Sequence, residues 1–145
     1  MLFFILNLFL ITALSFGQLG GLFTVAGIQV NLVLVCTIVF SIFEKDWFKR
    51  LLLIILASVI LSFGPSLDFD TLSRIIILVV SVILLDVLRW ERLINAALII
   101  PIATILSDMQ ILNRGDIIFR EIIWNLTAMA LLVLVITLFE RRLEG

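Results

Sequence analysis

The sequence predicts an all-α, polytopic integral membrane protein, with six transmembrane helices in a compact bundle that forms one domain, residues 1–145. Hydrophobic residues make up 63% of the chain and charged residues 14%, against about 45–50% and about 25% in soluble domains. A soluble domain of this size cannot hide so much apolar surface. Apolar runs separated by short polar turns recur throughout, and we expect spans at 2–16, 29–43, 51–63, 75–88, 93–106 and 117–139.

The first two runs flank a turn that is rich in glycine and free of charge. We expect 2–16 to be retained as a span, because no Lys or Arg precedes it as the start of a signal peptide would require. Residues 17–27 are either a short external turn or a re-entrant segment. Asn31, at the head of the second run, either forms a hydrogen bond across helices or marks the helix start at the interface.

The third run follows the charged loop Glu44–Arg50, EKDWFKR, and ends before Gly64-Pro65, a strong helix stop. Ser58 and Ser62 lie four residues apart within it. Small residues at this spacing allow two membrane helices to approach closely. We therefore expect Ser58 and Ser62 to form a helix contact.

Single acidic or kinking residues mark the fourth and fifth runs. Asp86 is either a proton or ion relay, or the partner of Arg89 in a local ion pair three residues apart. We favour the local pair, because Asp86 lies close to the loop. Pro101 falls inside the fifth run. Membrane helices tolerate such a proline where neighbouring groups satisfy the freed carbonyl.

The last run begins with polar residues that include Arg120, Glu121, Trp124 and Asn125. Glu121 and Asn125 are four residues apart and so share one helix face. They indicate a polar pocket or a partner contact in the external half of the membrane. The alternative, which we favour, places residues 117–121 in the headgroup zone, where charge costs little.

Lysine and arginine are distributed unevenly between alternate loops. One set contains Lys45, Lys49, Arg50, Arg89, Arg92, Arg141 and Arg142, and the other contains Arg74, Arg114 and Arg120. Short cytoplasmic loops carry the excess of positive charge. We therefore expect a multi-pass protein of the cytoplasmic membrane with both termini in the cytoplasm, and with Trp47 and Trp90 at that interface.

Catalytic and cofactor functions find little support in the residues. The chain has no histidine and one cysteine, Cys36, and its net charge of −1 excludes a polybasic nucleic-acid binder. No phosphate-binding, nucleophile or metal-ligand motif is present. We therefore expect no enzyme activity, no cofactor and no metal site. Oxygen ligands for a cation are available in the loop residues Asp68, Asp70, Asp108 and Asp116, but their spacing favours solvated loop charge.

The turn Leu19-Gly20-Gly21-Leu22-Phe23 and the following Val30-Asn31-Leu32 resemble the bacterial rod-shape-determining MreD family. Members commonly carry Pro-Asn-Leu at the head of the second span, and here Val30 replaces the proline. The resemblance implies a membrane scaffold in the machinery that elongates the bacterial cell wall and sets cell shape. It also implies an MreC-like bitopic partner and other cell-wall elongation components.

The MreD family is similar in fold to the substrate-binding subunits of energy-coupling-factor vitamin transporters, which gives a second hypothesis. Only that alternative requires a small-molecule ligand, held where polar residues converge. Arg120, Glu121, Trp124 and Asn125 are the candidates that cluster in sequence. The scarcity of polar residues in the second to fourth spans favours a scaffold, and a small membrane subunit of an unrelated complex is a third hypothesis. All three hypotheses imply that membrane lipid is a partner and that nucleic acid is not.

Overall fold

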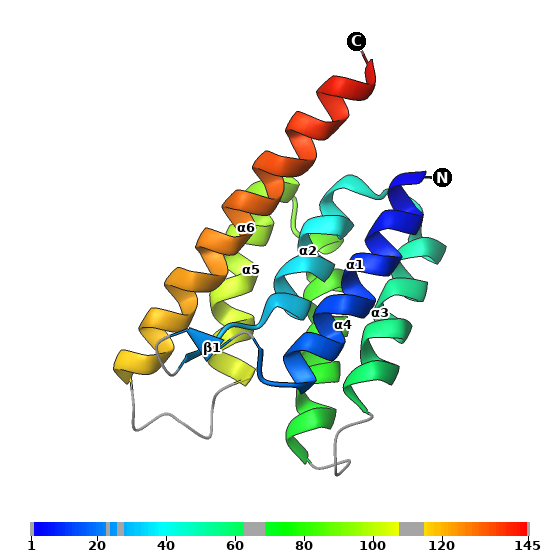
Figure 1. The fold of residues 1–145 in the computed structure, drawn as a ribbon. Coiled ribbons are helices and arrows are strands. Elements are labelled where there is room, and N and C mark those ends of the chain that lie inside the picture. Colours follow the sequence, from blue (N-terminus) through cyan, green and yellow to red (C-terminus); the bar gives the residue numbers. More distant parts are fainter. Residues whose placement is uncertain (1, 23, 26–27, 63–68, 108–114, 145) are drawn as a thin grey trace.

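The computed structural model describes residues 2–22, 24–25, 28–62, 69–107 and 115–144. Its elements are α1 (Leu2–Leu19), β1 (Thr24–Val25), β2 (Ile28–Gln29), α2 (Leu32–Phe43), α3 (Trp47–Leu61), α4 (Phe69–Val87), α5 (Arg92–Ser107) and α6 (Gly115–Glu144). The expected all-α fold with six helices is confirmed. Consecutive helices alternate in direction, and the two termini lie at the same end of the bundle (Figure 1). We call this end the terminal end and the opposite one the hairpin end.

Helix α2 lies at the centre of the bundle. It contacts each of the other five helices, and α6, α5, α4, α3 and α1 follow one another around it. Every residue from Val33 to Ser41 is buried. A helix that is apolar on all sides needs such complete enclosure. The position of α2 therefore follows from its composition.

The five helices around α2 turn large apolar side chains outward. Examples, one from each helix, are Phe9 (76% exposed), Phe48 (70%), Phe69 (79%), Ile102 (55%) and Leu131 (58%). Several polar side chains lie inside, whereas charged ones near the helix ends, such as Asp46, Arg89 and Arg120, are exposed. Those buried are Asn7, Ser15, Gln18, Thr37, Ser41, Arg50, Ser81, Asn95, Thr104, Glu121 and Asn125. This arrangement is the reverse of the usual one in soluble domains, where such polar residues are mostly exposed.

The first helix is longer than expected, because the glycine turn begins later. Leu22 N–H donates to the Gly17 carbonyl at 3.0 Å, and Gly21 N–H donates to the Gln18 carbonyl at 3.1 Å. Gly21 has a φ of 67°. Together these form a Schellman motif, in which a left-handed glycine ends the helix. Gly17 is therefore a buried residue of α1, whereas we expected it to start the turn.

The second and third helices also begin at positions that differ from the expected ones. Residues Ile28–Gln29 pair antiparallel with Thr24–Val25, so the second span's helix begins only at Leu32. Helix α3 begins at Trp47, because the Asp46 side chain accepts a hydrogen bond from Phe48 N–H at 3.0 Å as an N-cap. The expected loop therefore extends only to Asp46, and Arg50 lies within a helix.

Helix α5 runs close to its expected span, whereas α4 begins at Phe69, six residues before the expected start, and α6 extends beyond 117–139 at both ends. Asp70 and Arg74, which we expected in a loop, therefore lie within α4. Helix α5 continues through Pro101 as expected, and Gly64-Pro65 lies outside the described residues. By length and composition, one helix among the described residues meets the requirement for crossing a membrane, the Gly115–Leu138 part of α6. The segments Phe4–Gln18, Leu32–Phe43 and Arg92–Ser107 are apolar but shorter.

Candidate functional site

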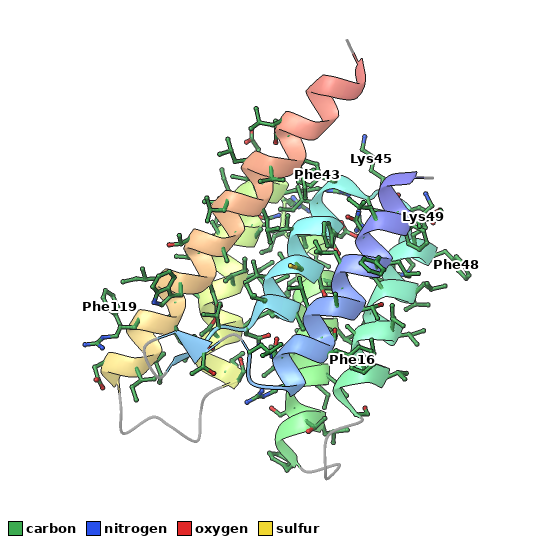
Figure 2. All side chains as sticks on the ribbon, in the orientation of Figure 1. Phe16, Phe43, Lys45, Phe48, Lys49 and Phe119 are labelled. Carbon is green, nitrogen blue, oxygen red and sulfur yellow. The ribbon has the colours of Figure 1, made fainter. Side chains whose placement is uncertain are left out.

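Buried and partly buried polar side chains gather at the two ends of α2. We call the group at the hairpin end the amide cluster, formed by Gln18, Asn31, Thr104 and Asn125. We call the group at the terminal end the ionic cluster, formed by Arg50, Asp86 and Arg92. Figure 2 shows the side chains around these ends, with Phe16 and Phe119 at the hairpin end and Lys45 and Lys49 at the terminal end.

Asn31 is the centre of the amide cluster and the N-cap of α2. Its side-chain oxygen accepts hydrogen bonds from Leu34 N–H at 3.2 Å and from Gln18 Nε2 at 3.3 Å. Its backbone N–H donates to Asn125 Oδ1 at 3.1 Å. Of the two interpretations of Asn31, the structure therefore supports both: it starts the helix, and it takes part in contacts to α1 and α6.

Two further bonds extend the amide cluster to a fourth helix. Asn125 Nδ2 donates to Thr104 Oγ1 on α5 at 2.9 Å, and that hydroxyl donates to the Ile100 carbonyl at 2.8 Å. On the opposite side, Gln18 Oε1 accepts from Val33 N–H at 3.2 Å. Asn125 and Thr104 are both fully buried. Four helices are thus connected by hydrogen bonds, each worth about 1 kcal/mol.

One small void lined by described residues lies beside the amide cluster. This void of about 10 Å³ is bordered by Gln18, Asn31, Arg74 and Ser107 together with apolar residues. That volume holds about one water molecule, whereas small-molecule sites occupy roughly 300–1,000 Å³. The amide cluster therefore fixes the helices relative to one another and leaves no room for a solute in this void.

The ionic cluster joins α3, α4 and α5 through one carboxylate. Arg50 Nη1 lies 2.5 Å from Asp86 Oδ2, and Arg92 Nη2 lies 3.3 Å from Asp86 Oδ1. The Arg50 side chain is only 1% exposed, whereas those of Asp86 and Arg92 are about one third exposed. A guanidinium so deeply buried requires a paired anion, because an unpaired buried charge is very costly.

The same two arginines also reach the C-terminal end of α2. Arg50 Nε donates to the Glu44 carbonyl, and Arg92 Nη1 donates to the Ile42 carbonyl at 3.2 Å. The last carbonyls of a helix have no partner within the helix. Cations at this end are also favoured by the helix dipole. The arginines therefore satisfy the end of the central helix while they neutralise Asp86.

The expected ion pair between Asp86 and Arg89 is wrong. Asp86 pairs with Arg50 and Arg92, and Arg89 is exposed. The reason is the early start of α3, which places Arg50 on the buried face that also carries Leu53 and Ala57. Arg50 of the neighbouring helix α3 therefore pairs with Asp86 in place of Arg89.

Asn95, which is fully buried, closes the turn between α4 and α5. Its Nδ2 lies 3.2, 3.0 and 3.2 Å from the carbonyl oxygens of Leu85, Leu88 and Trp90. Two buried atoms nearby have no hydrogen-bond partner, Arg50 Nη2 and Asn95 Oδ1. The terminal end therefore contains many hydrogen bonds, but two of its buried polar atoms have no partner.

The other sequence-predicted residues are dispersed. Ser58 and Ser62 border the buried face of α3, and the Ser62 hydroxyl donates to the Ser58 carbonyl at 2.7 Å within the helix. Glu121 is buried on the same helix face as Asn125, as expected, whereas Arg120 and Trp124 are exposed. Arg120, Glu121, Trp124 and Asn125 therefore do not converge on one pocket.

The expected acidic loops fall largely outside the described residues. This holds for Asp68 and Asp108, and nothing is described of the Asp70 side chain. Asp116 is exposed in the first turn of α6. Among the residues whose positions are described, no group of three or more His, Cys, Asp or Glu side chains is placed to hold a metal ion.

Sequence reasoning missed several residues that contribute to the two clusters. These are Gln18, Arg50, Arg92, Asn95 and Thr104. A helical signal existed for two of them. Gln18 continues the face of Asn7, Ile11 and Ser15, and recognising Asp46 as an N-cap would have placed Arg50 within a helix.

The described residues line at least two apolar grooves on the outside of the bundle. The larger, of about 480 Å³, runs between α4 and α5 and is lined by Ile76, Ile77, Val80, Ser81, Leu84, Leu88, Trp90, Leu98, Ile99, Ile102, Ala103 and Leu106. The smaller, of about 270 Å³, is lined by Leu22, Val30, Leu32, Trp124, Thr127, Ala128 and Leu131. Neither has the convergent polar groups that orient a solute.

Comparisons of the chain with models of protein families, with curated proteins and with solved structures found no match.

Proposed function

We propose that the chain is a multi-span protein of the bacterial cytoplasmic membrane and a scaffold subunit of the cell-wall elongation machinery, as its resemblance to the MreD family implies. Its partner is an MreC-like bitopic protein. In this proposal both termini face the cytoplasm, and the six helices form the membrane domain.

The observation that carries the membrane assignment is the reversed distribution of polarity. The exposed positions of α4 from Leu72 to Leu84 are all apolar, whereas Ser81 on the same helix is buried. The buried Asn125 on α6 is hydrogen-bonded to Asn31 and to Thr104 on α5. Lipid favours this arrangement, because polar groups exposed to hydrocarbon are costly.

The short helices are compatible with spanning when their ends are included. Lys45, Trp47 and Trp90 are exposed at the terminal end, and such side chains extend a helix into the headgroup zone. The termini lie at this same end (Figure 1). The excess of lysine and arginine therefore coincides with the end that we assign to the cytoplasm.

The scaffold is favoured over the vitamin-binding subunit by how the polar residues are used. Gln18, Asn31, Asn125 and Thr104 bond to one another and to backbone, and the void beside them holds about one water. In contrast, α6 offers a long apolar surface: only 22% of its membrane-length window is buried. An uncovered helix of this kind suits contact with a partner's membrane helix.

The topology is tested with a reporter fused after Gly145 and with carbonate extraction of membranes. We expect the chain to stay in the membrane fraction and the reporter to behave as cytoplasmic. An external reporter would overturn the orientation, and release by carbonate would overturn the membrane assignment.

The scaffold role is tested by depletion in the native host and by purification in mild detergent. We expect depletion to alter cell width and wall insertion, and an MreC-like protein to co-purify. Ala130→Trp, on the exposed face of α6, should weaken that association, whereas the matched Ile94→Trp on α5 should not. Co-purification of an ATPase module with a vitamin-sized ligand would instead support the transporter alternative.

A further inference from the structure

We propose that the groove between α4 and α5 is a binding site for an anionic phospholipid, with one acyl chain in the groove and the headgroup phosphate beside Arg89. This inference rests on the membrane assignment made above, but not on the scaffold role. It concerns a different surface from the uncovered face of α6.

The groove has the dimensions and chemistry of an acyl-chain site. Its volume is about 480 Å³, and its walls are aliphatic except for Ser81 and Trp90. Along α4 and the residue that follows it, the groove extends from Ile76 to Leu88, which corresponds to about 18 Å at 1.5 Å per residue. Half of the ~30 Å hydrocarbon core is about 15 Å. The groove therefore spans about one leaflet, as a single lipid chain does.

The groove ends at the basic, Trp-bearing turn of the terminal end. Leu88 and Trp90 both line it, and Arg89 lies between them in sequence. Trp90 is 62% exposed, and indole rings favour the depth of lipid headgroups. Arg89 is exposed and takes part in no ion pair found among the described residues. An apolar groove thus leads to a free guanidinium at headgroup depth.

The neighbouring charges favour a headgroup with net negative charge over a zwitterionic one, although both contain a phosphate. Asp86, three residues before Arg89, is neutralised by Arg50 and Arg92. Glu91 is exposed in the same turn and opposes the anion. With Arg50, Asp86, Arg89, Glu91 and Arg92 counted together, this end carries one net positive charge. Basic sites between membrane helices on the cytoplasmic side are suited to anionic headgroups.

Native mass spectrometry of the full chain in nonionic detergent tests the proposal. Phosphatidylglycerol and phosphatidylcholine with identical acyl chains are added separately at equal concentration, and the lipid-bound fraction is measured. We expect phosphatidylglycerol to bind at least fivefold more tightly. Arg89→Gln should lower that affinity about fivefold, since one arginine near an anionic surface contributes about that factor. Glu91→Gln should raise it.

Two tryptophan variants separate groove binding from general adhesion of lipid. Val80→Trp fills the groove from an exposed position and should reduce binding of both lipids, whereas Leu134→Trp on α6 should leave binding unchanged. Arg120→Gln, at the hairpin end, is the charge control and should have no effect. The variants' unfolding midpoints confirm that each is folded.

Several outcomes would overturn the proposal. Equal retention of both lipids by the wild-type chain would contradict the preference for an anionic headgroup. Unchanged lipid binding by Val80→Trp would show that the groove is not the binding site. A dimer that Val80→Trp dissociates, without lipid adducts, would make the groove a contact between copies. Release of the chain from membranes by carbonate would contradict the membrane assignment on which the lipid site rests. Failure of an MreC-like protein to co-purify would contradict the scaffold role but not the lipid site.

Discussion

Both ends of α2 have backbone groups that need hydrogen-bond partners from outside the helix, and the two ends obtain them from different side chains. At its N-terminal end, Val33 and Leu34 donate their N–H groups to side-chain oxygens of Gln18 and Asn31. At its C-terminal end, the Ile42 and Glu44 carbonyls accept from Arg92 and Arg50. A buried helix end needs acceptors at one terminus and donors at the other. A guanidinium has only donors and therefore suits the C-terminal end, whereas the oxygen of an amide can serve the N-terminal end.

The difference has an energetic consequence. An amide at the N-terminal end satisfies backbone groups without introducing charge, so its loss leaves neutral groups unpaired at about 1–3 kcal/mol. An arginine at the C-terminal end requires a counter-ion, and Asp86 supplies it for two arginines. Removing one member of a buried ion pair costs about 3–5 kcal/mol. We therefore expect the terminal end to be the more sensitive of the two.

The largest effect is expected from Asp86→Asn. The change keeps the shape of the side chain but leaves the buried Arg50 guanidinium without an anion. We expect the free energy of unfolding in mixed micelles to fall by about 3 kcal/mol, the lower end of the range for buried pairs, because Asp86 is partly exposed. Glu91→Gln in the neighbouring turn is the matched control and should change stability by less than about 0.5 kcal/mol.

Adding Arg50→Met to Asp86→Asn sharpens this prediction. Removing both charges eliminates the unpaired guanidinium and its unbonded Nη2 atom. Replacing a buried ion pair by apolar groups is often neutral, so we expect the double variant to recover at least half of the loss. A double variant less stable than Asp86→Asn alone would show that Arg50 acts mainly through its bond to the Glu44 carbonyl.

A smaller loss is expected at the hairpin end from Asn125→Leu. Leucine nearly preserves the volume but leaves the Asn31 N–H without its acceptor and removes the bond to Thr104. We expect the free energy of unfolding to fall by about 2 kcal/mol because of the unpaired donor, as measured by the same unfolding titration. Thr127→Val, on the exposed side of the same helix, should be nearly neutral. If Asn125→Leu proved as costly as Asp86→Asn, charge would not be what distinguishes the two ends.

The two ends were unequally predictable from the sequence. Asn31 and Asn125 can both be identified from the sequence, because an amide in an apolar run is conspicuous. Their hydrogen bond cannot be predicted in the same way, because the two residues are 94 positions apart in the chain. Asp86 was identified and assigned the wrong partner, because Arg89 is adjacent in sequence and Arg50 becomes available only through the packing of α3 against α4. Helix number followed from the apolar runs. Helix ends did not, because caps such as Asp46 and Gly21 set them.

Asn31→Leu should have a local effect of about 1 kcal/mol, the usual contribution of an N-cap. The variant removes the acceptor for Leu34 N–H and for Gln18 Nε2 but keeps the Asn31 backbone N–H bonded to Asn125. We expect faster hydrogen exchange at Leu34, with exchange near Ser41 unchanged. Equal acceleration at both positions would show that α2 opens as a unit. The two ends would then not be independent.

The smallest effect is expected from Ser58→Ala, which lies in neither cluster. The Ser58 hydroxyl is buried without a hydrogen-bond partner, although its carbonyl accepts from Ser62. Removing an unsatisfied hydroxyl while keeping the backbone bond should leave stability unchanged or raise it by a few tenths of a kcal/mol, since alanine is the better helix former. Ser62→Ala serves as the comparison. A loss of more than about 1 kcal/mol for Ser58→Ala would mean that its hydroxyl bonds to another helix. The serine pair would then be a third polar contact, and satisfaction of polar groups would extend along the bundle beyond the two ends of α2.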